Sequence, residues 1–278
     1  IVAQIEFGIF PSDNNQYKDM LLSKKYSDNW KFAMWHTVLR EPTHTILSYI
    51  NDIDREYDLH IVHTAIQKVW LSRYVTKPVE IIPHGTLLWE PTGKDEARLR
   101  IGNENGILFS KDDKIMFSFG FAAESKGLTQ LIEAAKKVKI PNFKLVISGA
   151  PHGAAKEFTQ KIIDDLKKMA DTSNIIILGR HLTDDEINMW ASASDVLVFN
   201  YTTPPYVASA SGAMKRVLAS GKPILCVDDN RLEELVNGQH CIKYKIGDTN
   251  DMISCIETLL LDNTLAEKLG KNCRLLAE

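Results

Sequence analysis

The stretch YVASASGAMKRVLASGKPILCV, residues 206 to 227, predicts a loop, a short helix and a buried strand in immediate succession. The predicted helix covers 212 to 220 and ends at Gly221, because glycine is favoured just after a helix. Four small residues begin it and leave the first-turn N–H groups open, namely Ser209, Ala210, Ser211 and Gly212. Open N–H groups at a helix start favour an anion, although helix capping alone also explains these residues. The stretch therefore indicates an α/β domain and a candidate anion site.

The second half of the chain alternates apolar runs with helical patterns, which is typical of a parallel sheet covered on both faces. Six apolar runs predict strands at 115–119, 143–147, 174–178, 195–199, 223–227 and 241–244. Helices are predicted at 126–138, 154–170, 184–192, 212–220 and 232–237, and after residues 248 and 263. Ligands of such doubly wound sheets bind at the carboxyl ends of the strands, so the loops there form the candidate site.

The first part of the chain shows the same alternation, with strands predicted at 1–7, 31–36, 59–62 and 79–82 and helices at 43–56 and 64–74. Residues 86–114 combine prolines, glycines and mixed charges without a sustained period, which predicts a linker. We therefore expect two Rossmann-like, doubly wound domains facing across a cleft, at 1–90 and 114–278, joined by a linker at 91–113. Because the chain starts with Ile1 inside a predicted strand, we expect a piece of a longer protein with an incomplete first domain.

The composition is that of an ordinary globular protein, with 44% hydrophobic residues, 25% charged residues and a net charge of −3. This charge gives no electrostatic case for nucleic acid, and no stretch approaches the roughly 18 apolar residues of a membrane-spanning helix. The cysteines lack metal-ligand spacing and are expected to be reduced thiols: Cys226, Cys241, Cys255 and Cys273. We expect a cytoplasmic protein with at most peripheral membrane contact, and the oligomeric state is left open.

The loop GFAAESKG, residues 120 to 127, follows the first strand of the second domain and opens its first helix. Its spacing matches neither the glycine pattern of dinucleotide sites nor a phosphate loop with a Lys-Ser/Thr pair. Lys126 stands in the first helical turn, where a cation is unfavourable beside the positive end of the helix dipole. A bound phosphate would offset that cost, and a solvated lysine at a helix start is the alternative.

Two further loops end neighbouring strands of the second domain, GAPHG at 149–153 and GRHLT at 179–183. Such glycine-marked loops can present backbone to a flat base. His152 and His181 within them are expected to be exposed loop histidines rather than ligands, because no carboxylate or thiol stands at metal spacing. His36 follows a buried strand of the first domain and is expected to point to the cleft, with a capping or core role as the alternative.

The triplet Asp52-Ile53-Asp54 has the form of the metal-nucleotide triplet of some sugar transferases. It falls at the end of an amphipathic helix, where side chains two residues apart diverge by about 200° and cannot hold one ion. We therefore predict no metal site.

Taken together, these segments resemble the retaining, nucleotide-sugar-dependent glycosyltransferases of the GT-B fold, in the glycogen-synthase-like and mannosyltransferase-like group (glycosyltransferase family 4, group 1). FGFAAESKGLTQLIEAAKKV is similar to that family's phosphate loop, and LGRHLTDDEINMWASASDVLVFNY to its nucleotide-base segment. SASGAMKRVLASGKPILCVDDNRLEELVNGQHCIKYKIGDTNDM resembles its donor-site helix together with the segment after that helix. QIEFGIF, MWHTVLREP and IIPHGT look like acceptor-domain strands of one branch.

Two departures from the family pattern fall in the donor site. The family usually carries a pair of glutamates, the second of which binds ribose, at positions that are Ala208 and Arg216 here. The arginine usual after the phosphate-loop glycine is replaced by Phe121, which leaves Lys126 as the main cation of that loop.

The resemblance implies transfer of a sugar from a nucleotide-diphosphate sugar to a glycan, lipid-linked or small-molecule acceptor, with retention, without a metal and without a further cofactor. His36 and Lys126 would be catalytic. The residues implied to bind the donor are Gly120, Phe121, Lys126, Gly149, Arg180, His181, Leu182, Ser209, Ala210, Ser211, Gly212 and Arg216. Glu6, Gly8 and His84 would lie on the acceptor side. Because the acidic pair is absent, the alternative is a non-catalytic or partner-dependent member that binds a nucleotide sugar or only another protein.

Overall fold

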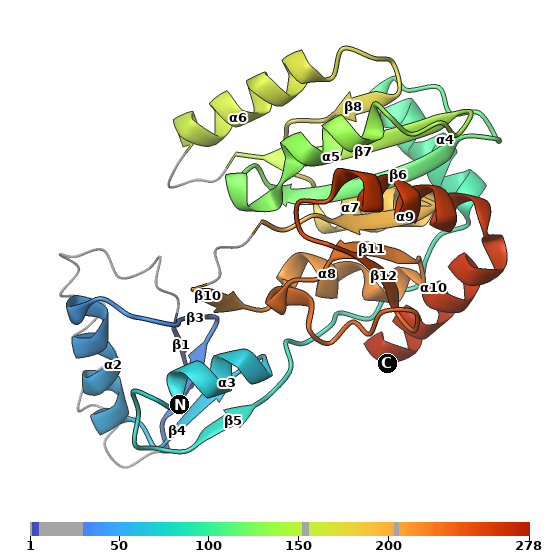
Figure 1. Ribbon diagram of the computed structural model, residues 1–278. Helices are drawn as coiled ribbons and strands as arrows, with labels where there is room; N and C mark the ends of the chain where they lie inside the picture. The colour runs from blue at the N-terminus through green and yellow to red at the C-terminus, as the bar shows by residue number, and fades with distance from the viewer. Residues whose placement is uncertain (1, 6–29, 152–155, 203–205) are drawn as a thin grey trace. The chain divides into compact units, whose positions relative to one another are not determined.

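The structure is a computed structural model that describes residues 2–5, 30–151, 156–202 and 206–278. The chain divides into two compact units (Figure 1). The first unit holds residues 1–85 and 204–211, and the second holds 86–203 and 212–278. Glu6, Gly8 and His152 of the sequence predictions lie outside the described residues.

The second unit is built on a six-stranded parallel sheet in the order β12-β11-β9-β6-β7-β8. Its strands are β6 (Lys114–Phe121), β7 (Phe143–Ala150), β8 (Ile175–Ile177), β9 (Val196–Phe199), β11 (Ile224–Val227) and β12 (Cys241–Tyr244). After β8 the chain crosses back to place β9 on the other side of β6. The order of the strands reverses there, and in open α/β sheets ligands bind at this switch point, beyond the carboxyl ends of the strands.

The helices of the second unit are α4 (Lys94–Asn105), α5 (Leu128–Ala135), α6 (Lys156–Met169), α7 (Asp184–Ala193), α8 (Gly212–Val217), α9 (Thr249–Leu261) and α10 (Asn263–Ala277). Short 3₁₀ turns are η3 (Glu124–Lys126), η5 (Leu218–Ser220) and η6 (Asn230–Leu232). Every residue of β9 and β11 is buried, as expected for strands covered on both faces. The predicted α/β class and the six predicted strands are confirmed.

Two helix predictions need correction. The helix expected at 212–220 is an α-helix only to Val217 and then tightens to η5, which ends at Gly221 in the left-handed conformation with φ 63°. The helix expected at 232–237 is absent, and only η6 stands before it. There the Asp229 carboxylate accepts the Arg231 N–H, which caps a single tight turn, and Gly238 with φ 75° follows.

The predicted linker at 91–113 instead contains α4, and the second unit begins at residue 86. The helix packs through Ala97 and Ile101 into the core of that unit. Arg98, only 5% exposed, donates to the carbonyl of Ala193 and to the carboxylate of Asp195. Sequence periodicity missed this helix because a buried arginine occupies its inward face.

The first unit contains a four-stranded parallel sheet in the order β1-β2-β4-β5. The strands are β1 (Val2–Ile5), β2 (Phe32–Trp35), β4 (Leu59–Val62) and β5 (Val79–Ile81), with helices α2 (His44–Glu56) and α3 (Ala65–Leu71). The described strands follow one another across the sheet without a reversal, unlike those of the second unit.

A short segment before α8 belongs to the first unit, which differs from the predicted division of the chain. Strand β10 (Val207–Ser209) pairs antiparallel with β3 (Thr37–Leu39), so that Ala208 faces Val38 (Figure 1). Ala208 is fully buried in the core of the first unit. The domain prediction missed this pairing because the strand is three residues long and its partner is distant in sequence.

Among the described residues, no helix has the length and apolar character needed to cross a membrane.

Candidate functional site

A small pocket lies at the switch point of the second unit, at the carboxyl ends of β6, β7 and β9. Four residues that the sequence assigned to the donor site line it, namely Gly120, Phe121, Lys126 and Gly149. Asn200 and Tyr201, which follow β9, and the hydroxyls of Ser118 and Ser148 add further polar groups to the lining. The structure therefore brings Gly149 together with the 120–127 loop at the place where such sheets bind ligands.

Lys126 is held in this pocket by a tight loop. It ends η3, and Gly127 follows in the left-handed conformation with φ 56°. A Cβ on Gly127 would stand 2.5 Å from the side-chain nitrogen of Asn200, which donates to the Gly127 carbonyl. Tyr244 in turn donates from its hydroxyl to Asn200 Oδ1 at 2.6 Å. This chain of contacts fixes the loop after β6 against the end of β9.

The charge of Lys126 has little compensation. Its Nζ lies 4.2 Å from the centroid of the Tyr201 ring. Burial and the nearby Arg231 together lower the pKa of Lys126 to about 8, against the opposite effect of Asp229. Within the described residues, no carboxylate lies within ion-pairing distance of Lys126. A desolvated ammonium group of this kind favours binding of an anion.

Arg231 is a second cation beside the Tyr201 ring, although it is not among the residues that line the pocket, and it was not predicted from the sequence. It lies on η6, after β11, and its Cζ is 5.1 Å from the centroid of the same Tyr201 ring. The available signal was its place just after a strand that neighbours β9 in the sheet. The predicted helix at 232–237 hid it, because a residue before a helix reads as part of a cap.

The loop of Arg180, His181 and Leu182 does not line the Lys126 pocket, and its side chains have other partners. Arg180 pairs with Glu186 at 2.6 Å and donates to Asn105, and Leu182 is buried in the core. His181 is exposed, as predicted. The hydroxyl of Ser148, which lines the Lys126 pocket, donates to the Arg180 carbonyl at 3.0 Å.

The predicted helix-start residues fall on both units. Ser209, Ala210 and Ser211 belong to the first unit, and Gly212 starts the six-residue α8 of the second. Arg216 on α8 pairs with Asp184 at 2.8 Å. Neither Gly212 nor Arg216 lines the Lys126 pocket as the structure describes it.

Three histidines gather at the strand ends of the first unit. His36, His63 and His84 follow β2, β4 and β5, and their ring centroids lie 5.0 to 6.2 Å apart. His63 Nδ1–H donates to the Ile82 carbonyl at 2.9 Å, and His63 Nε2 shares a hydrogen bond with His36 Nδ1 at 3.2 Å. His36 Nε2 contacts the side-chain amide of Gln4. Burial and the neighbouring His84 lower the pKa of His36. His63 was missed, although it follows a strand as His36 does.

The carboxylates of Asp52 and Asp54 bind different partners. Asp52 pairs with Arg55, and Asp54 accepts from His60, Thr76 and the Lys77 N–H. Among the residues that the structure describes, no group of histidines, cysteines and carboxylates has the arrangement of a metal site.

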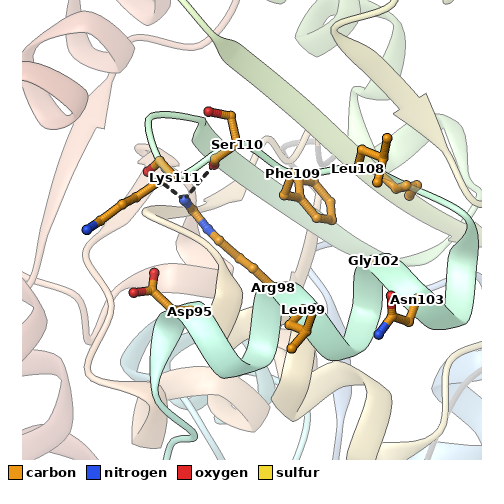
Figure 2. A pocket seen from close by; sticks show the side chains of 10 residues that line it. Asp95, Arg98, Leu99, Gly102, Asn103, Leu108, Phe109, Ser110 and Lys111 are labelled. Carbon is orange, nitrogen blue, oxygen red and sulfur yellow. Dashed lines mark hydrogen bonds between the residues drawn. The ribbon is translucent and has the colours of Figure 1, made fainter.

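A larger cavity, of about 300 Å³, lies between α4 and the segment that leads into β6 (Figure 2). Arg98 reaches across it and donates to the carbonyls of Ser110 and Lys111 (Figure 2). None of the predicted site residues lines this cavity. It lies beside the segment that enters β6, away from the carboxyl ends of the strands, and Arg98 there ties α4 to the sheet.

Solved structures share this fold. Sucrose-phosphate synthase from Thermosynechococcus elongatus matches 89% of the chain at 20% identity, with a TM-score of 0.72. HepE of Anabaena, solved with UDP and glucose, matches 90% at 15% identity, also with a TM-score of 0.72. A UDP-forming α,α-trehalose-phosphate synthase from Burkholderia xenovorans matches 90% at 15% identity, with a TM-score of 0.65. The matches cover 62%, 67% and 64% of those three proteins respectively. No curated protein sequence matches the chain.

The fold is therefore that of the GT-B proteins, with Rossmann-like parallel sheets. The family model "Glycosyl transferases group 1" matches residues 103–275, and the chain belongs to this family.

Proposed function

We propose that the protein transfers a sugar from a nucleoside-diphosphate sugar to an acceptor hydroxyl, with retention at the anomeric carbon. The observation that carries this proposal is the Lys126 pocket. A partly buried ammonium without a carboxylate partner in the described residues lies at the switch point of a Rossmann-like sheet. The relatives solved with UDP and a sugar, or described as UDP-forming, support a nucleoside diphosphate as the anion.

In this proposal Lys126 acts on the leaving group. As the bond between the sugar and the diphosphate breaks, negative charge grows on the phosphate oxygens. A cation held in a dry site stabilises this developing charge more than it stabilises the ground state. Lys126 therefore lowers the barrier as well as binding the donor.

The acceptor side is proposed for the strand ends of the first unit. His84 belongs to the histidine cluster there, and a neutral imidazole both donates to and accepts from sugar hydroxyls. His36 of the same cluster is kept in the proposal as a catalytic residue that acts on the donor sugar, on the family resemblance. We keep Glu6 and Gly8 in this proposal on the family resemblance alone.

Metal independence is also part of the proposal, because protein cations at the pocket supply the charge that a divalent ion would otherwise supply. Activity that a chelator abolishes and that magnesium or manganese restores would contradict it.

The experiment that tests the function is a thermal-shift panel of UDP, GDP and ADP with their sugar conjugates, followed by a transfer and hydrolysis assay of any donor that binds. A ligand at 100 times its dissociation constant stabilises the folded state by about 2.7 kcal/mol, which is readily measured. Binding of none of these nucleotides would contradict the proposal.

A second candidate is a non-catalytic protein that binds a nucleotide sugar or only a protein partner. Arg216, which stands where the family carries its ribose-binding glutamate, is engaged by Asp184, and Ala208 offers no carboxylate either. Donor binding without transfer or hydrolysis over a broad acceptor panel would favour this candidate.

A further inference from the structure

We propose that Arg231 is a second diphosphate-binding residue, which supplies from the loop after β11 the cation that Phe121 does not supply in the loop after β6. This inference rests on the proposed function and extends it to a residue outside the family's phosphate loop. Lys126 and Arg231, here called the cation pair, would hold one diphosphate between them.

The cation pair is built around one aromatic ring. Tyr201, which is 2% exposed, has Lys126 Nζ at 4.2 Å and Arg231 Cζ at 5.1 Å from its ring centroid. The two residues come from the loops after β6 and β11, and these strands flank β9, whose end carries Tyr201. The two charges therefore lie beside the same ring, and the proposal places one diphosphate between them.

The position of Arg231 is fixed by its neighbours. Asp229 accepts the Arg231 backbone N–H at 2.9 Å, and the next residue, Leu232, is fully buried. The carboxylate of Asp229 therefore caps this turn, and its charge also raises the pKa of Lys126. The other acid of that turn, Asp228, pairs with Lys243 at 3.0 Å.

The guanidinium itself has unused binding capacity. Its Nε is buried and has no hydrogen-bond partner among the residues that the structure describes. Within the same residues, neither member of the cation pair makes an ion pair. Asp229 offsets the repulsion between these two charges only in part, because the pKa of Lys126 stays lowered, and a bound anion would offset the rest. A diphosphate has the charge and the number of acceptor oxygens to do so.

The test measures binding of UDP, GDP, ADP and inorganic pyrophosphate by calorimetry to the 278-residue chain and to Arg231→Gln, Lys126→Met and Lys243→Gln. Lys243→Gln is the matched control, because it removes a cation at a neighbouring strand that already pairs with Asp228. We expect Arg231→Gln to weaken the affinity for the diphosphate that binds by about tenfold. Lys243→Gln should weaken the same affinity by less than about twofold. The corresponding nucleoside should bind all four proteins alike, since it carries no phosphate. Unfolding curves of each variant establish that it is folded.

The outcomes separate the two proposals. Diphosphate binding that is lost in Lys126→Met but unchanged in Arg231→Gln overturns the role of Arg231 and leaves the proposed function standing. Pyrophosphate binding that depends on both cations, without binding of any nucleotide, supports the cation pair and contradicts the nucleotide-sugar donor. Equal losses in Arg231→Gln and Lys243→Gln also overturn the inference, because they would show a general charge effect.

Discussion

The strand ends of the two units carry different chemistry, although both sheets are parallel. Those of the second unit present two cations around Tyr201, and those of the first present three imidazoles. Cations with little compensation select an anion, whereas neutral imidazoles select groups that both donate and accept hydrogen bonds. The same sheet edge can therefore serve a phosphate in one unit and hydroxyls in the other, and the side chains alone make the difference.

The units also differ in how buried polar groups are satisfied. In the first unit a chain of hydrogen bonds runs through the interior, from Trp35 Nε1 to His60 Nδ1 and from His60 Nε2 to Asp54, both at 3.0 Å. Burial alone would raise the pKa of Asp54, but the hydrogen bonds from Thr76 and His60 outweigh it and lower the pKa to about 2. Lys126 in the second unit has no comparable carboxylate partner among the described residues. One buried charge is thus structural and the other is available to a ligand.

The largest expected effect concerns that structural carboxylate. Asp54→Ala would leave the donors of His60, Thr76 and Lys77 unpaired, and we expect it to cost about 3 kcal/mol of unfolding free energy. Urea unfolding measures the loss, and hydrogen exchange should locate it in the first unit. Glu80→Ala is the control, since the exposed carboxylate of Glu80 pairs with Lys68 at 3.2 Å, and it should cost less than about 0.5 kcal/mol.

This stabilisation has a defined pH window. The pKa of Asp54 is lower in the folded state than in the unfolded state, so its contribution is complete above about pH 4 and lost as the pH falls to about 2. The gap between the parent and Asp54→Ala should narrow over that range. A gap that persists at pH 2 would mean that the carboxylate charge is not what stabilises the unit.

The next effect concerns the available charge. Lys126→Ala should weaken binding of a nucleoside diphosphate by on the order of ten- to a hundredfold, the value of a charge-assisted hydrogen bond to phosphate. Turnover should fall at least as much, because the diphosphate gains charge as the sugar leaves. Parent-like binding and turnover would mean that Lys126 does not bind the diphosphate.

The stability of variants without the Lys126 charge gives an independent control. Because the pKa of Lys126 is lowered to about 8 in the folded state, the unfolded state binds the proton more tightly. The folded state therefore gains stability as the pH rises from about 8 to about 10.5, and the charge costs stability at pH 7. Lys126→Met should unfold at higher urea than the parent at pH 7, so weaker binding could not be attributed to unfolding.

A smaller expected effect is that the stability of the first unit falls more than that of the second unit as the pH is lowered. Burial lowers the pKa of both His36 and His60 in the first unit, so the unfolded state binds protons first as the pH falls below about 6.5. In the second unit only one histidine among the described residues, His240, has a lowered pKa. Hydrogen exchange at pH 7 and pH 5 should show a larger loss of protection in the first unit. An equal loss of protection in both units would show that titration of the histidines does not cause it.

The strands of the sheets and the position of Lys126 could be predicted from the sequence, whereas helix α4 and Arg231 could not. Continuous apolar runs such as Val196–Phe199 indicate buried parallel strands, and Lys126 follows one such run in a loop marked by glycine. Helix α4 was missed because Arg98 is buried through bonds to carbonyls and to Asp195, which no periodicity reveals. Arg231 was missed because the shared Tyr201 ring is a contact between loops far apart in sequence, and only the strand order brings them together.

The smallest expected effect is the most specific one for the cation pair, and it uses the family's own arrangement. Phe121, which is 45% exposed, lines the Lys126 pocket at the position where the family resemblance implies an arginine. If Arg231 already supplies the second cation, Phe121→Arg in the parent chain adds a charge that is largely redundant, and nucleoside-diphosphate binding should tighten by less than about threefold. In an Arg231→Gln background the same substitution should recover most of the lost affinity. Calorimetry with the same diphosphate compares the four proteins of this double-mutant cycle, and a gain that is equal in both backgrounds would mean that the two positions act on different parts of the ligand.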